Sequence, residues 1–416
     1  MIERLNLETP GSHDPGSKPG SPAQILLSRN LADLSAFWPR SNEGHLAQCY
    51  AFQYADILEV RCATIAAARK LETLFLAVVD TQGQPMMLLP WAIERRWGVR
   101  VLSFLDGGLS DYNAPVIFPA AQHWGEDEMR IVWQGLQRIL PPFDVAILDK
   151  MPEQVSDFSN PLNLLATAPF PLSGHAATLS GNWREFQANL LPKRQDSRRQ
   201  RRRLEQRGSL TFEIAATPEQ FDAMLAALIR QKVHHHRETL TVAGFDQPGY
   251  RAFVTQMTHR LSALVPVHLS ALKIDGMIIA AHWGYVAGSR FYYLIPSYET
   301  GIFRSFSPGR ILLEYLLEWS YANGVEVFDF GLGDEIYKTE YCDVLIPLRI
   351  AAMPANLRGA VYLIALNARE KVASKIRDTR FGRSLKRLVR RNRSGVEQQG
   401  ARDKQEEELT TVSSAK

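Results

Sequence analysis

Apolar residues recur along the chain at two spacings, every second position and every third or fourth, which predict strands and helices respectively. In the first half, apolar runs predict strands at 74–79, 86–93, 99–105 and 145–148. Apolar residues at helical spacing predict helices at 47–70 and 129–139. The segment Asp80-Thr81-Gln82-Gly83 separates the first two strands and predicts a tight turn. The first half is therefore expected to be a mixed α/β structure.

The second half shows a similar order of elements. Its predicted strands are at 210–214, 267–274, 277–286, 291–295, 325–330 and 345–350. Its predicted helices are at 183–206, 218–237, 248–263 and 308–322. The clearest signal is Asp275-Gly276, because Asp-Gly between two β-rich runs is a strong hairpin turn. The shared order predicts two copies of one fold, although the two halves show no residue-level repeat.

The chain is expected to form more than one domain, because 416 residues exceed what one hydrophobic core usually supports. We expect a disordered leader at 1–24, globular domains at 25–175 and 176–350, a basic helical tail at 351–391 and a disordered tail at 392–416. The leader is rich in Pro, Gly and Ser and lacks the apolar segment of a secretory signal. The apolar runs are all shorter than the roughly 20 residues that cross a bilayer. These features predict a cytoplasmic protein.

Charge is unevenly distributed, although the formal net charge is only +4. Basic residues cluster at 193–207 and again at 377–393. Such clusters attract phosphates on a cofactor, a nucleic acid or a lipid head group. A solvated helix face explains the first cluster equally well and is the commoner case. The basic tail is either an amphipathic helix that contacts a membrane surface or a partner, or a helix that packs on a sheet.

Metal binding is not indicated by the sequence. The three cysteines include no C-x-x-C pair, which predicts neither a disulfide framework nor a zinc site. His234, His235 and His236 are adjacent, and adjacent side chains on a helix point about 100° apart, so they do not converge on one ion. His282 lies in an apolar strand and is expected to be a core residue. We therefore expect no metal cofactor.

A phosphate-binding turn is predicted at 307–310, where Ser-Pro-Gly-Arg lies between a strand and a helix. Ser307 is expected to cap the helix through its hydroxyl, Pro308 suits the first helical position, and Gly309 lets an anion approach the backbone. The amides of Gly309, Arg310 and Ile311 are expected to face outward at the positive end of the helix dipole. The cofactor-binding residues predicted here are Arg304, Ser307, Gly309 and Arg310. The alternative is a capped helix that binds nothing.

Acidic, phenolic and ammonium groups follow the strand predicted at 325–330. They lie in the run Asp329-Phe330-Gly331-Leu332-Gly333-Asp334-Glu335-Ile336-Tyr337-Lys338. In open α/β sheets, ligands collect at the ends of strands. The triplet Asp-Phe-Gly also occurs in protein kinases, but the chain has neither the preceding Gly-rich loop nor a His-Arg-Asp motif. The run is therefore interpreted as candidate active-site chemistry of another kind.

These residues resemble a known family. The order Tyr292-Tyr293, Ser307-Pro308-Gly309, a helix and then 329–338 is similar to that of the CelD-type cellulose-biosynthesis acetyltransferases. That family belongs to the GNAT superfamily and is distantly related to the FemAB peptidyltransferases. The segments 201–208 and Ser110-Asp111-Tyr112 also resemble it. The resemblance covers roughly residues 30–350 and is most specific at 290–340.

The resemblance implies a fold and a donor. The fold is an α/β class with mixed sheets, a tandem GNAT-like acyltransferase fold followed by a helical tail. The donor is an acyl group, most simply acetyl, on coenzyme A, bound beside splayed strands of the second copy. The turn at 307–310 departs from the usual pyrophosphate motif, Arg/Gln-x-x-Gly-x-Gly/Ala, because it keeps only one glycine. FemAB relatives use aminoacyl-tRNA instead.

The chemistry of such enzymes assigns roles to particular residues. A base near the nucleophile and an acid for the leaving thiolate are needed. The predicted base is Asp334 or Glu335, and the predicted acid is Tyr337. Lys338 is expected to hold a phosphate or a substrate carboxylate. The predicted substrate-binding residues are Asp111, Tyr112, Tyr292, Tyr293 and Asp329. The alternatives are that Gly-Asp-Glu caps a following helix and that Tyr337 is a packing residue.

Three functions therefore compete. The leading one is transfer from acyl-coenzyme A to an amine or hydroxyl of a small-molecule or saccharide acceptor, with polysaccharide or exopolysaccharide synthesis suggested by the resemblance alone. The second is a FemAB-like transferase that uses aminoacyl-tRNA, but no long helical arm is apparent between 216 and 266. The third is a non-catalytic protein that binds polyanions or a membrane surface through its arginines. No specific nucleic-acid partner is expected under the leading function, and the basic tail is a candidate for peripheral membrane contact.

Overall fold

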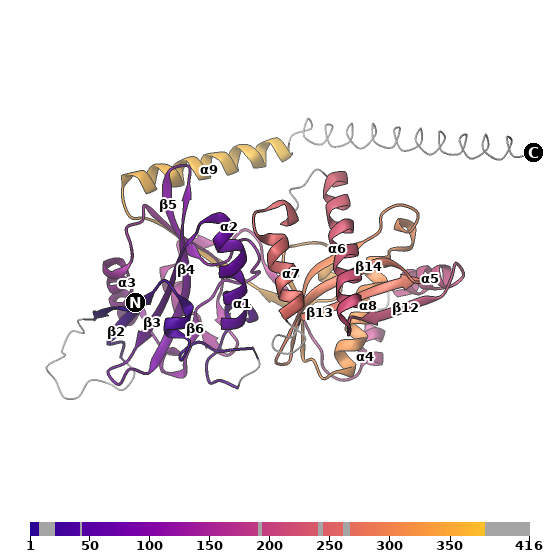
Figure 1. Cartoon of the computed structure of the whole chain (residues 1–416), viewed down its shortest axis with the longest axis horizontal. Coiled ribbons are helices and arrows are strands. Elements are labelled where there is room, and N and C mark those ends of the chain that lie inside the picture. Colours follow the sequence, from indigo (N-terminus) through magenta and orange to yellow (C-terminus); the bar gives the residue numbers. More distant parts are fainter. Residues whose placement is uncertain (8–20, 42–43, 190–193, 240–243, 261–266, 379–416) are drawn as a thin grey trace, which may run out of the picture. The chain divides into compact units, whose positions relative to one another are not determined.

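The computed structural model describes residues 1–7, 21–41, 44–189, 194–239, 244–260 and 267–378. Contacts divide the chain into two compact units, 1–355 and 356–416. The first unit contains both large sheets (Figure 1). The second contains a described helix, α9 (Leu357–Asp378), within the predicted basic tail. The tail predicted to be disordered, 392–416, lies outside the described residues.

The N-terminal segment is ordered in part. Residues Glu3–Asn6 form β1 and pair antiparallel with β2 (Gln24–Ser28). Leu5 and Leu7 pack where a side chain at Gly135 would otherwise lie. The expectation of a disordered leader at 1–24 is therefore wrong for β1, because two leucines anchor it. Residues 8–20 lie outside the described part of the chain.

The first sheet has nine strands among the described residues, in the order β1-β2-β3-β4-β5-β7-β18-β10, with β6 paired to β4. The further strands are β3 (Glu72–Val79), β4 (Pro85–Arg96), β5 (Val99–Phe104), β6 (Val116–Ile117), β7 (Val145–Pro152), β10 (Ala168–Pro169) and β18 (Leu348–Pro354). All four strands predicted in the first half are confirmed. A separate hairpin joins β8 (Gln154–Val155) and β9 (Phe158–Ser159).

The second sheet has the order β12-β13-β14-β15-β16-β11-β17. Its strands are β11 (Gly174–Thr178), β12 (Leu210–Ile214), β13 (Val267–Ile274), β14 (Met277–Ala287), β15 (Arg290–Tyr298), β16 (Val327–Leu332) and β17 (Val344–Ile346). The predicted hairpin at Asp275-Gly276 joins β13 and β14. The strand predicted at 345–350 is wrong, because these residues form β17 and β18, which belong to different sheets.

Helices lie on both sheets. They are α1 (Ala55–Arg61), α2 (Ala67–Arg69), α3 (Glu126–Ile139), α4 (Trp183–Asn189), α5 (Arg194–Glu205), α6 (Pro218–Thr239), α7 (Tyr250–Arg260) and α8 (Pro308–Ala322). A π-helical turn, Cys62–Ala66, joins α1 to α2. The helix predicted at 47–70 therefore starts later than expected. The one predicted at 183–206 is two helices, and residues 190–193 between them lie outside the described part.

The two sheets repeat one motif, which confirms the predicted fold class. In each, a meander of antiparallel strands leads through a helix to a strand parallel to the last one: β3-β4-β5, α3 and β7, then β13-β14-β15, α8 and β16. Each parallel strand then gains an antiparallel neighbour from elsewhere in the chain. β11 joins β16, and β18 joins β7. The predicted boundaries at 175 and 350 stay predictions, and both lie within or beside these exchanged strands.

The two copies share an apolar core. Phe52 of the first copy contacts Tyr292 of the second, with ring centroids 5.5 Å apart. The backbone amide of Ala51 donates to the Tyr292 hydroxyl at 3.2 Å. Both aromatic residues belong to one cluster of buried residues that also includes Tyr112 and Trp283. Because this core is continuous, loops of the first copy are held firmly against strand ends of the second.

Candidate active site

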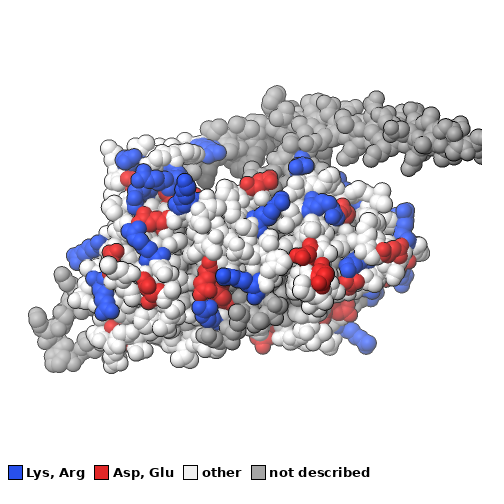
Figure 2. Space-filling view, in the orientation of Figure 1, with Lys and Arg blue, Asp and Glu red and all other residues white. Residues whose placement is uncertain are grey.

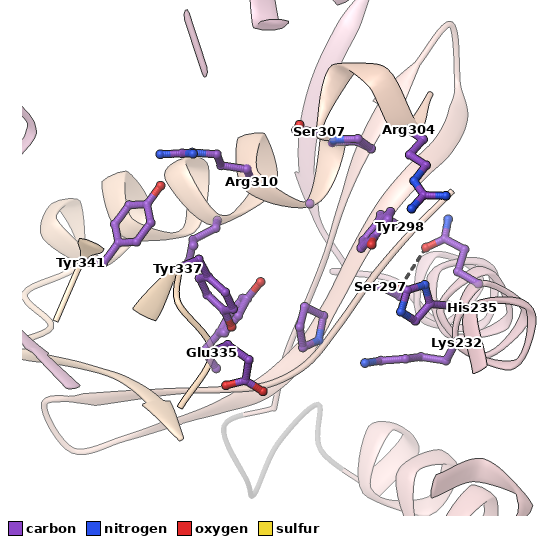
Figure 3. Close-up of a pocket in the computed structure, with 16 residues that line it drawn as sticks. Lys232, His235, Ser297, Tyr298, Arg304, Ser307, Arg310, Glu335, Tyr337 and Tyr341 are labelled. Carbon is purple, nitrogen blue, oxygen red and sulfur yellow. Dashed lines mark hydrogen bonds between the residues drawn. The ribbon is translucent and has the colours of Figure 1, made fainter. Parts of the chain in front are cut away.

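The strands β15 and β16 part after a short parallel pairing. Only Arg290–Tyr292 pair with Val327–Asp329, although β15 continues to Tyr298 and β16 to Leu332. A cavity of about 660 Å³ lies beside the later part of β15 (Figure 3). Its walls come from β15, α6, the start of α8 and the loop after β16. The lining residues are Gln231, Lys232, His235, Tyr293, Pro296, Ser297, Tyr298, Arg304, Ser307, Pro308, Gly309, Arg310, Leu313, Glu335, Tyr337 and Tyr341.

The start of α8 differs from the predicted turn in its hydrogen bonds. Ser307 has a left-handed backbone, with φ 51°, and its side chain makes no capping bond, so the predicted hydroxyl cap is wrong. Its carbonyl instead accepts from the amides of Arg310 and Ile311, at 3.0 and 3.2 Å. Two of the three amides predicted to be free are therefore occupied. The amide of Gly309 remains available to a ligand in the cavity.

A side chain at Gly309 would crowd Tyr298. A Cβ atom there would lie 3.1 Å from Cδ1 of Tyr298, closer than ordinary van der Waals contact. Its absence lets the helix start against the ring of Tyr298, which lines the same cavity. The backbone of Gly309 therefore faces the cavity without a side chain in the way.

Basic residues surround the helix start. Arg304 lines the cavity beside Tyr298 (Figure 3). Arg310 also lines it but forms an ion pair with Glu340, with 3.1 Å between Nη2 and Oε2. The helix α5 lies alongside, because the guanidinium groups of Arg203 and Arg207 stack on the ring of Phe306, at 4.9 and 5.5 Å. Phe306 immediately precedes Ser307, so the basic cluster predicted from the sequence flanks the start of α8.

Sequence reasoning missed Lys232, which extends from α6 toward Glu335 across the cavity (Figure 3). Burial lowers the pKa of Lys232 to about 8, and Glu335 opposes this shift only in part. Lys232 follows Leu228 by four positions, so it continues the apolar stripe of the helix. A lysine in such a stripe is the sequence signal that would have found it.

The predicted catalytic residues occupy different positions. Tyr337 lines the cavity, and burial together with the nearby Glu335 raises its pKa. Glu335 also lines the cavity and pairs with Nζ of Lys338 at 3.0 Å. Asp334 does not line it, and accepts a hydrogen bond from Nε2 of His175 at 3.0 Å, which lowers the pKa of Asp334.

Lys338 is buried below the cavity and is not among its lining residues. Its ammonium donates to the carbonyls of Gly331 and Leu332, at 3.2 and 2.8 Å. It therefore braces the end of β16. The loop continues as a 3-10 turn, Lys338–Glu340, and no α-helix follows Gly-Asp-Glu in this described segment.

The predicted substrate-binding residues divide between two faces of the second sheet. Tyr293 lines the cavity. Tyr112 and Asp329 are buried between the two copies, where the Tyr112 hydroxyl donates to Asp329 Oδ1 at 2.8 Å. Arg290 donates to the other carboxylate oxygen of Asp329 at 2.7 Å. Together with Tyr292, these side chains fix the place where β15 and β16 part.

His282 lies behind Tyr293 and is fully buried. The two rings stack with centroids 4.7 Å apart, and burial holds the pKa of His282 well below its usual value. It is therefore a neutral packing residue, as the sequence pattern suggested. Within the described residues, no group of three or more His, Cys, Asp or Glu side chains is placed to hold a metal ion.

Residues 192–339 match the family model for an acetyltransferase (GNAT) domain. This segment is therefore similar to GNAT-type acetyltransferase domains. It contains β12 to β16 and α6 to α8, and therefore most of the cavity wall. No curated protein sequence matches the chain. Among the described residues, none of the helices combines the length and apolar character required to span a bilayer.

Solved structures resemble the chain at low sequence identity. FemX is 10% identical, with 73% of this chain and 92% of FemX covered at a TM-score of 0.50. The C-terminal domain of a putative lysylphosphatidylglycerol synthetase from Agrobacterium fabrum is 13% identical, with 74% and 95% covered and a TM-score of 0.46. A tandem GNAT protein from the clavulanic acid biosynthesis pathway is 11% identical, with 86% and 100% covered and a TM-score of 0.42. The likeness to FemX shows a shared fold alone.

Proposed function

We propose that the protein transfers an acyl group from acyl-coenzyme A to an acceptor amine or hydroxyl. The observation that carries the proposal is the cavity that extends from Gly309 along the part of β15 that β16 leaves unpaired. The Gly309 amide and the positive end of the α8 dipole suit a diphosphate. The unpaired backbone of β15 offers hydrogen-bonding groups to an extended, amide-containing arm such as pantetheine.

The charges near the cavity support a phosphate-bearing donor. Arg304 and Lys232 both line the cavity, and Lys232 points across it toward Glu335 (Figure 3). Lys232 forms no ion pair among the described residues. Because its pKa is lowered to about 8, binding of an anion beside it would favour the charged ammonium. Arg203 and Arg207 extend the positive region beyond the helix start.

The transfer needs no covalent enzyme intermediate. A neutral nucleophile attacks the thioester carbonyl carbon, the carbon–sulfur bond breaks, and the thiolate takes a proton. Tyr337 is the proposed proton donor, because it lines the cavity and its raised pKa keeps the phenol protonated. Glu335 and Lys338 hold the loop that carries this phenol through their ion pair.

Aminoacyl-tRNA is the second candidate donor, because the fold likeness to FemX favours it. The arginines of α5 suit either carrier. Coenzyme A is preferred for two reasons. The cavity has the volume of a small-molecule site, and the helix α6 packs on β13, β14 and β15.

The acceptor class is proposed from the resemblance to CelD-type enzymes, which suggests a saccharide or another small molecule in polysaccharide biosynthesis. A purely electrostatic binding function has less support. On the face shown in Figure 2, basic and acidic side chains are interspersed rather than gathered into one basic patch. Peripheral membrane contact through the basic tail stays a proposal, and so does a cytoplasmic location.

Calorimetric titration of the full chain tests the donor. Acetyl-coenzyme A and free coenzyme A are expected to bind, and Arg304→Ala is expected to weaken both. Arg138→Ala is the matched control, because Arg138 is an exposed arginine on α3. Uncharged tRNA titrated at two salt concentrations tests the second donor, since polyanion binding weakens steeply with salt. Absence of heat with every coenzyme A species would overturn the proposal.

A further inference from the structure

A second cavity, of about 110 Å³, lies on the opposite face of β15. Tyr293 lines the large cavity, whereas the next residue, Leu294, lines the small one. Ile295 also lines the small cavity and 296–298 line the large one, so both cavities border the stretch of β15 that β16 leaves unpaired. The lining residues of the small cavity are Gly108, Leu109, Asp111, Tyr250, Phe253, Trp283, Tyr285, Leu294 and Ile295. Its walls are therefore mainly apolar and aromatic.

Asp111 is the carboxylate in this small cavity, and the first copy supplies it. A Cβ atom at Gly331 would lie 2.1 Å from Oδ2 of Asp111, so the carboxylate occupies the space that a side chain there would take. Gly331 has a left-handed backbone, with φ 70°, and lies two residues beyond the last β15–β16 pair. The amide of Leu332 also donates to the carboxylate. Asp111 is thus held at the point where the strands part.

The charges around Asp111 are already engaged with other groups. Lys150 is paired with Asp106, Asp329 with Arg290, and Lys338 with Glu335. The phenols near Asp111 are those of Tyr112, Tyr250 and Tyr337. Asp111 forms no ion pair among the described residues. Burial, reinforced by Asp329, raises the pKa of Asp111 to about 7 against the opposing effect of the two lysines.

We propose that the small cavity receives the reacting end of the acceptor, a primary amine on a short uncharged stem, and that Asp111 accepts its proton. This inference rests on the proposed acyl transfer. An unpaired carboxylate attracts an ammonium group, and the aromatic walls suit methylene groups and a cation. Since a water molecule occupies about 30 Å³ in the liquid, the cavity has room for roughly four heavy atoms. Larger parts of the acceptor remain outside it.

In the proposed step, the ammonium form of the acceptor gives one proton to Asp111, and the neutral nitrogen attacks the thioester carbonyl carbon. A carbon–nitrogen bond forms and the carbon–sulfur bond breaks. Tyr337 gives its proton to the leaving thiolate. The nitrogen, positively charged after the attack, loses one more proton as the amide forms, and this proton restores the Tyr337 phenol. The net products are an amide, a free thiol and one proton, which Asp111 releases to solvent.

Asp111 suits this role better than the two carboxylates predicted from the sequence. The side chains of Asp334 and Glu335 are 50% and 57% exposed, and each is paired, with His175 and Lys338 respectively. A proton acceptor is most effective when its pKa lies near the working pH. Asp111 meets that condition and lies against Gly331, beside the place where β15 and β16 part.

The first test compares Asp111→Asn with Asp149→Asn. Asparagine keeps an acceptor for the Leu332 amide, and Asp149 is a matched carboxyl whose pKa burial also raises, but which lies outside the small cavity. With n-propylamine as probe and acetyl-coenzyme A as donor, thiol release by Asp111→Asn should fall about 100-fold or more. The parent rate should rise with pH through about 7, as the Asp111 carboxyl ionises. Asp111→Asn should lose that rise, and Asp149→Asn should match the parent in both respects.

The second test measures acceptor binding without turnover. Titration of n-propylamine into the parent saturated with free coenzyme A should give heat, whereas n-propanol should give none, and Asp111→Asn should lose the amine signal. Coenzyme A should bind all variants equally, which shows that they are folded. An unchanged rate and pH profile in Asp111→Asn, or equal binding of the alcohol, would overturn the inference while leaving the donor proposal intact. A parent that binds no coenzyme A would overturn both.

Discussion

The two copies of the fold place a helix start at the same topological position, but the two starts have opposite electrostatic character. The first turn of α3 carries Glu126, Asp127 and Glu128, and Glu128 Oε2 accepts from the Gly125 amide at 3.0 Å. The first turn of α8 carries no acidic residue and exposes the Gly309 amide. A phosphate would therefore be repelled by the first start and attracted by the second.

Two buried lysines show the same contrast. Lys150 lies in the cavity of about 290 Å³ beside the end of β5 in the first copy. Burial alone would lower the pKa of Lys150, but the ion pair with Asp106 outweighs it and raises the pKa. Among the described residues Lys232 of the second copy has no such pair, and burial lowers its pKa to about 8. Lys150 is thus neutralised within the first copy, whereas Lys232 of the second copy is available to the proposed ligand.

Under the proposed function, the first copy supports the structure and the second copy binds the donor. The first copy keeps the parallel strands β5 and β7, but the ion pairs Arg69–Glu94 and Lys150–Asp106 line the cavity beside them. It contributes Tyr112 and Asp111 to the place where β15 and β16 part. We therefore expect substitutions in the first copy to change stability or acceptor chemistry, and substitutions around α8 to change donor binding.

The largest expected effect is on stability, from Lys150→Met. The substitution leaves Asp106 and the Ser110 carbonyl without their partner in a buried place. Removing one member of a buried ion pair typically costs about 3–5 kcal/mol. The midpoint of urea unfolding should fall strongly, and Lys273→Met is the control, because Lys273 pairs with Glu213 on a more exposed strand. Equal midpoints for the two variants would contradict the view that the first copy depends on its internal charges.

The next effect is on the chemical step, from Tyr337→Phe. Loss of the proton donor should lower kcat about 100-fold while the dissociation constant of acetyl-coenzyme A stays the same. Tyr321→Phe is the control, because Tyr321 lies on α8 with its hydroxyl bonded to the Ser180 carbonyl, away from the cavity. Thiol release and calorimetry together separate rate from binding. A parent-like kcat in Tyr337→Phe would show that Tyr337 is a packing residue.

A smaller effect is expected when the start of α8 is made to resemble that of α3. Gly309→Glu places an acid beside the proposed diphosphate and should weaken coenzyme A binding on the order of 30-fold, as expected for one lost charge-assisted hydrogen bond. A glutamate near a helix N-terminus favours the helix, but its Cβ would lie 3.1 Å from Cδ1 of Tyr298, so urea unfolding of the variant checks that the fold survives. The reciprocal change, Glu126→Gln with Asp127→Asn on α3, should leave coenzyme A affinity unaltered. Equal affinities for all three proteins would remove the proposed distinction between the two helix starts.

The sequence predicted the second copy well where strong local signals mark its elements. The helix at 308–322 has the expected bounds because Pro308 fits the first turn and Asn323-Gly324 stops it. The hairpin at Asp275-Gly276 is equally well marked. The predicted residues Arg304, Ser307, Gly309, Arg310, Glu335 and Tyr337 line one cavity, because the crossover helix α8 connects β15 to its parallel neighbour β16. Local pattern and fold topology agree there.

Features that depend on contacts between distant segments were not predictable from one sequence. The strand β11 pairs with β16, and β18 pairs with β7, although the paired strands are far apart in the sequence. No local pattern predicts these pairings. The left-handed backbone of Ser307 is incompatible with the expected hydroxyl cap. The sequence did not predict it, because serine is ordinarily a good cap and left-handed conformations are rare outside glycine. The approach of Asp111 to Gly331 likewise depends on how the two copies pack.

The smallest expected effect concerns Lys232 and sharpens the contrast with Lys150. Because the pKa of Lys232 in the folded protein, about 8, lies below the value near 10.5 of an unfolded lysine, the unfolded chain binds more protons between these values. The stability of the parent should therefore rise, relative to Lys232→Met, as pH increases from about 8 toward 10. Urea unfolding at pH 7, 8 and 9.5 measures this difference, with Lys232→Met the more stable protein at pH 7.

Ligand binding should reverse the state of the same lysine. A diphosphate near Lys232 favours the ammonium form, so coenzyme A binding at pH 8.5 should take up protons in the parent and fewer in Lys232→Met. Calorimetry in two buffers of different ionisation enthalpy measures the uptake. The affinity itself should fall only a few-fold in Lys232→Met, since one partly screened cation contributes about 1 kcal/mol. If proton uptake is the same in both proteins, the donor phosphates do not reach Lys232, and Lys232 does not contribute to donor binding.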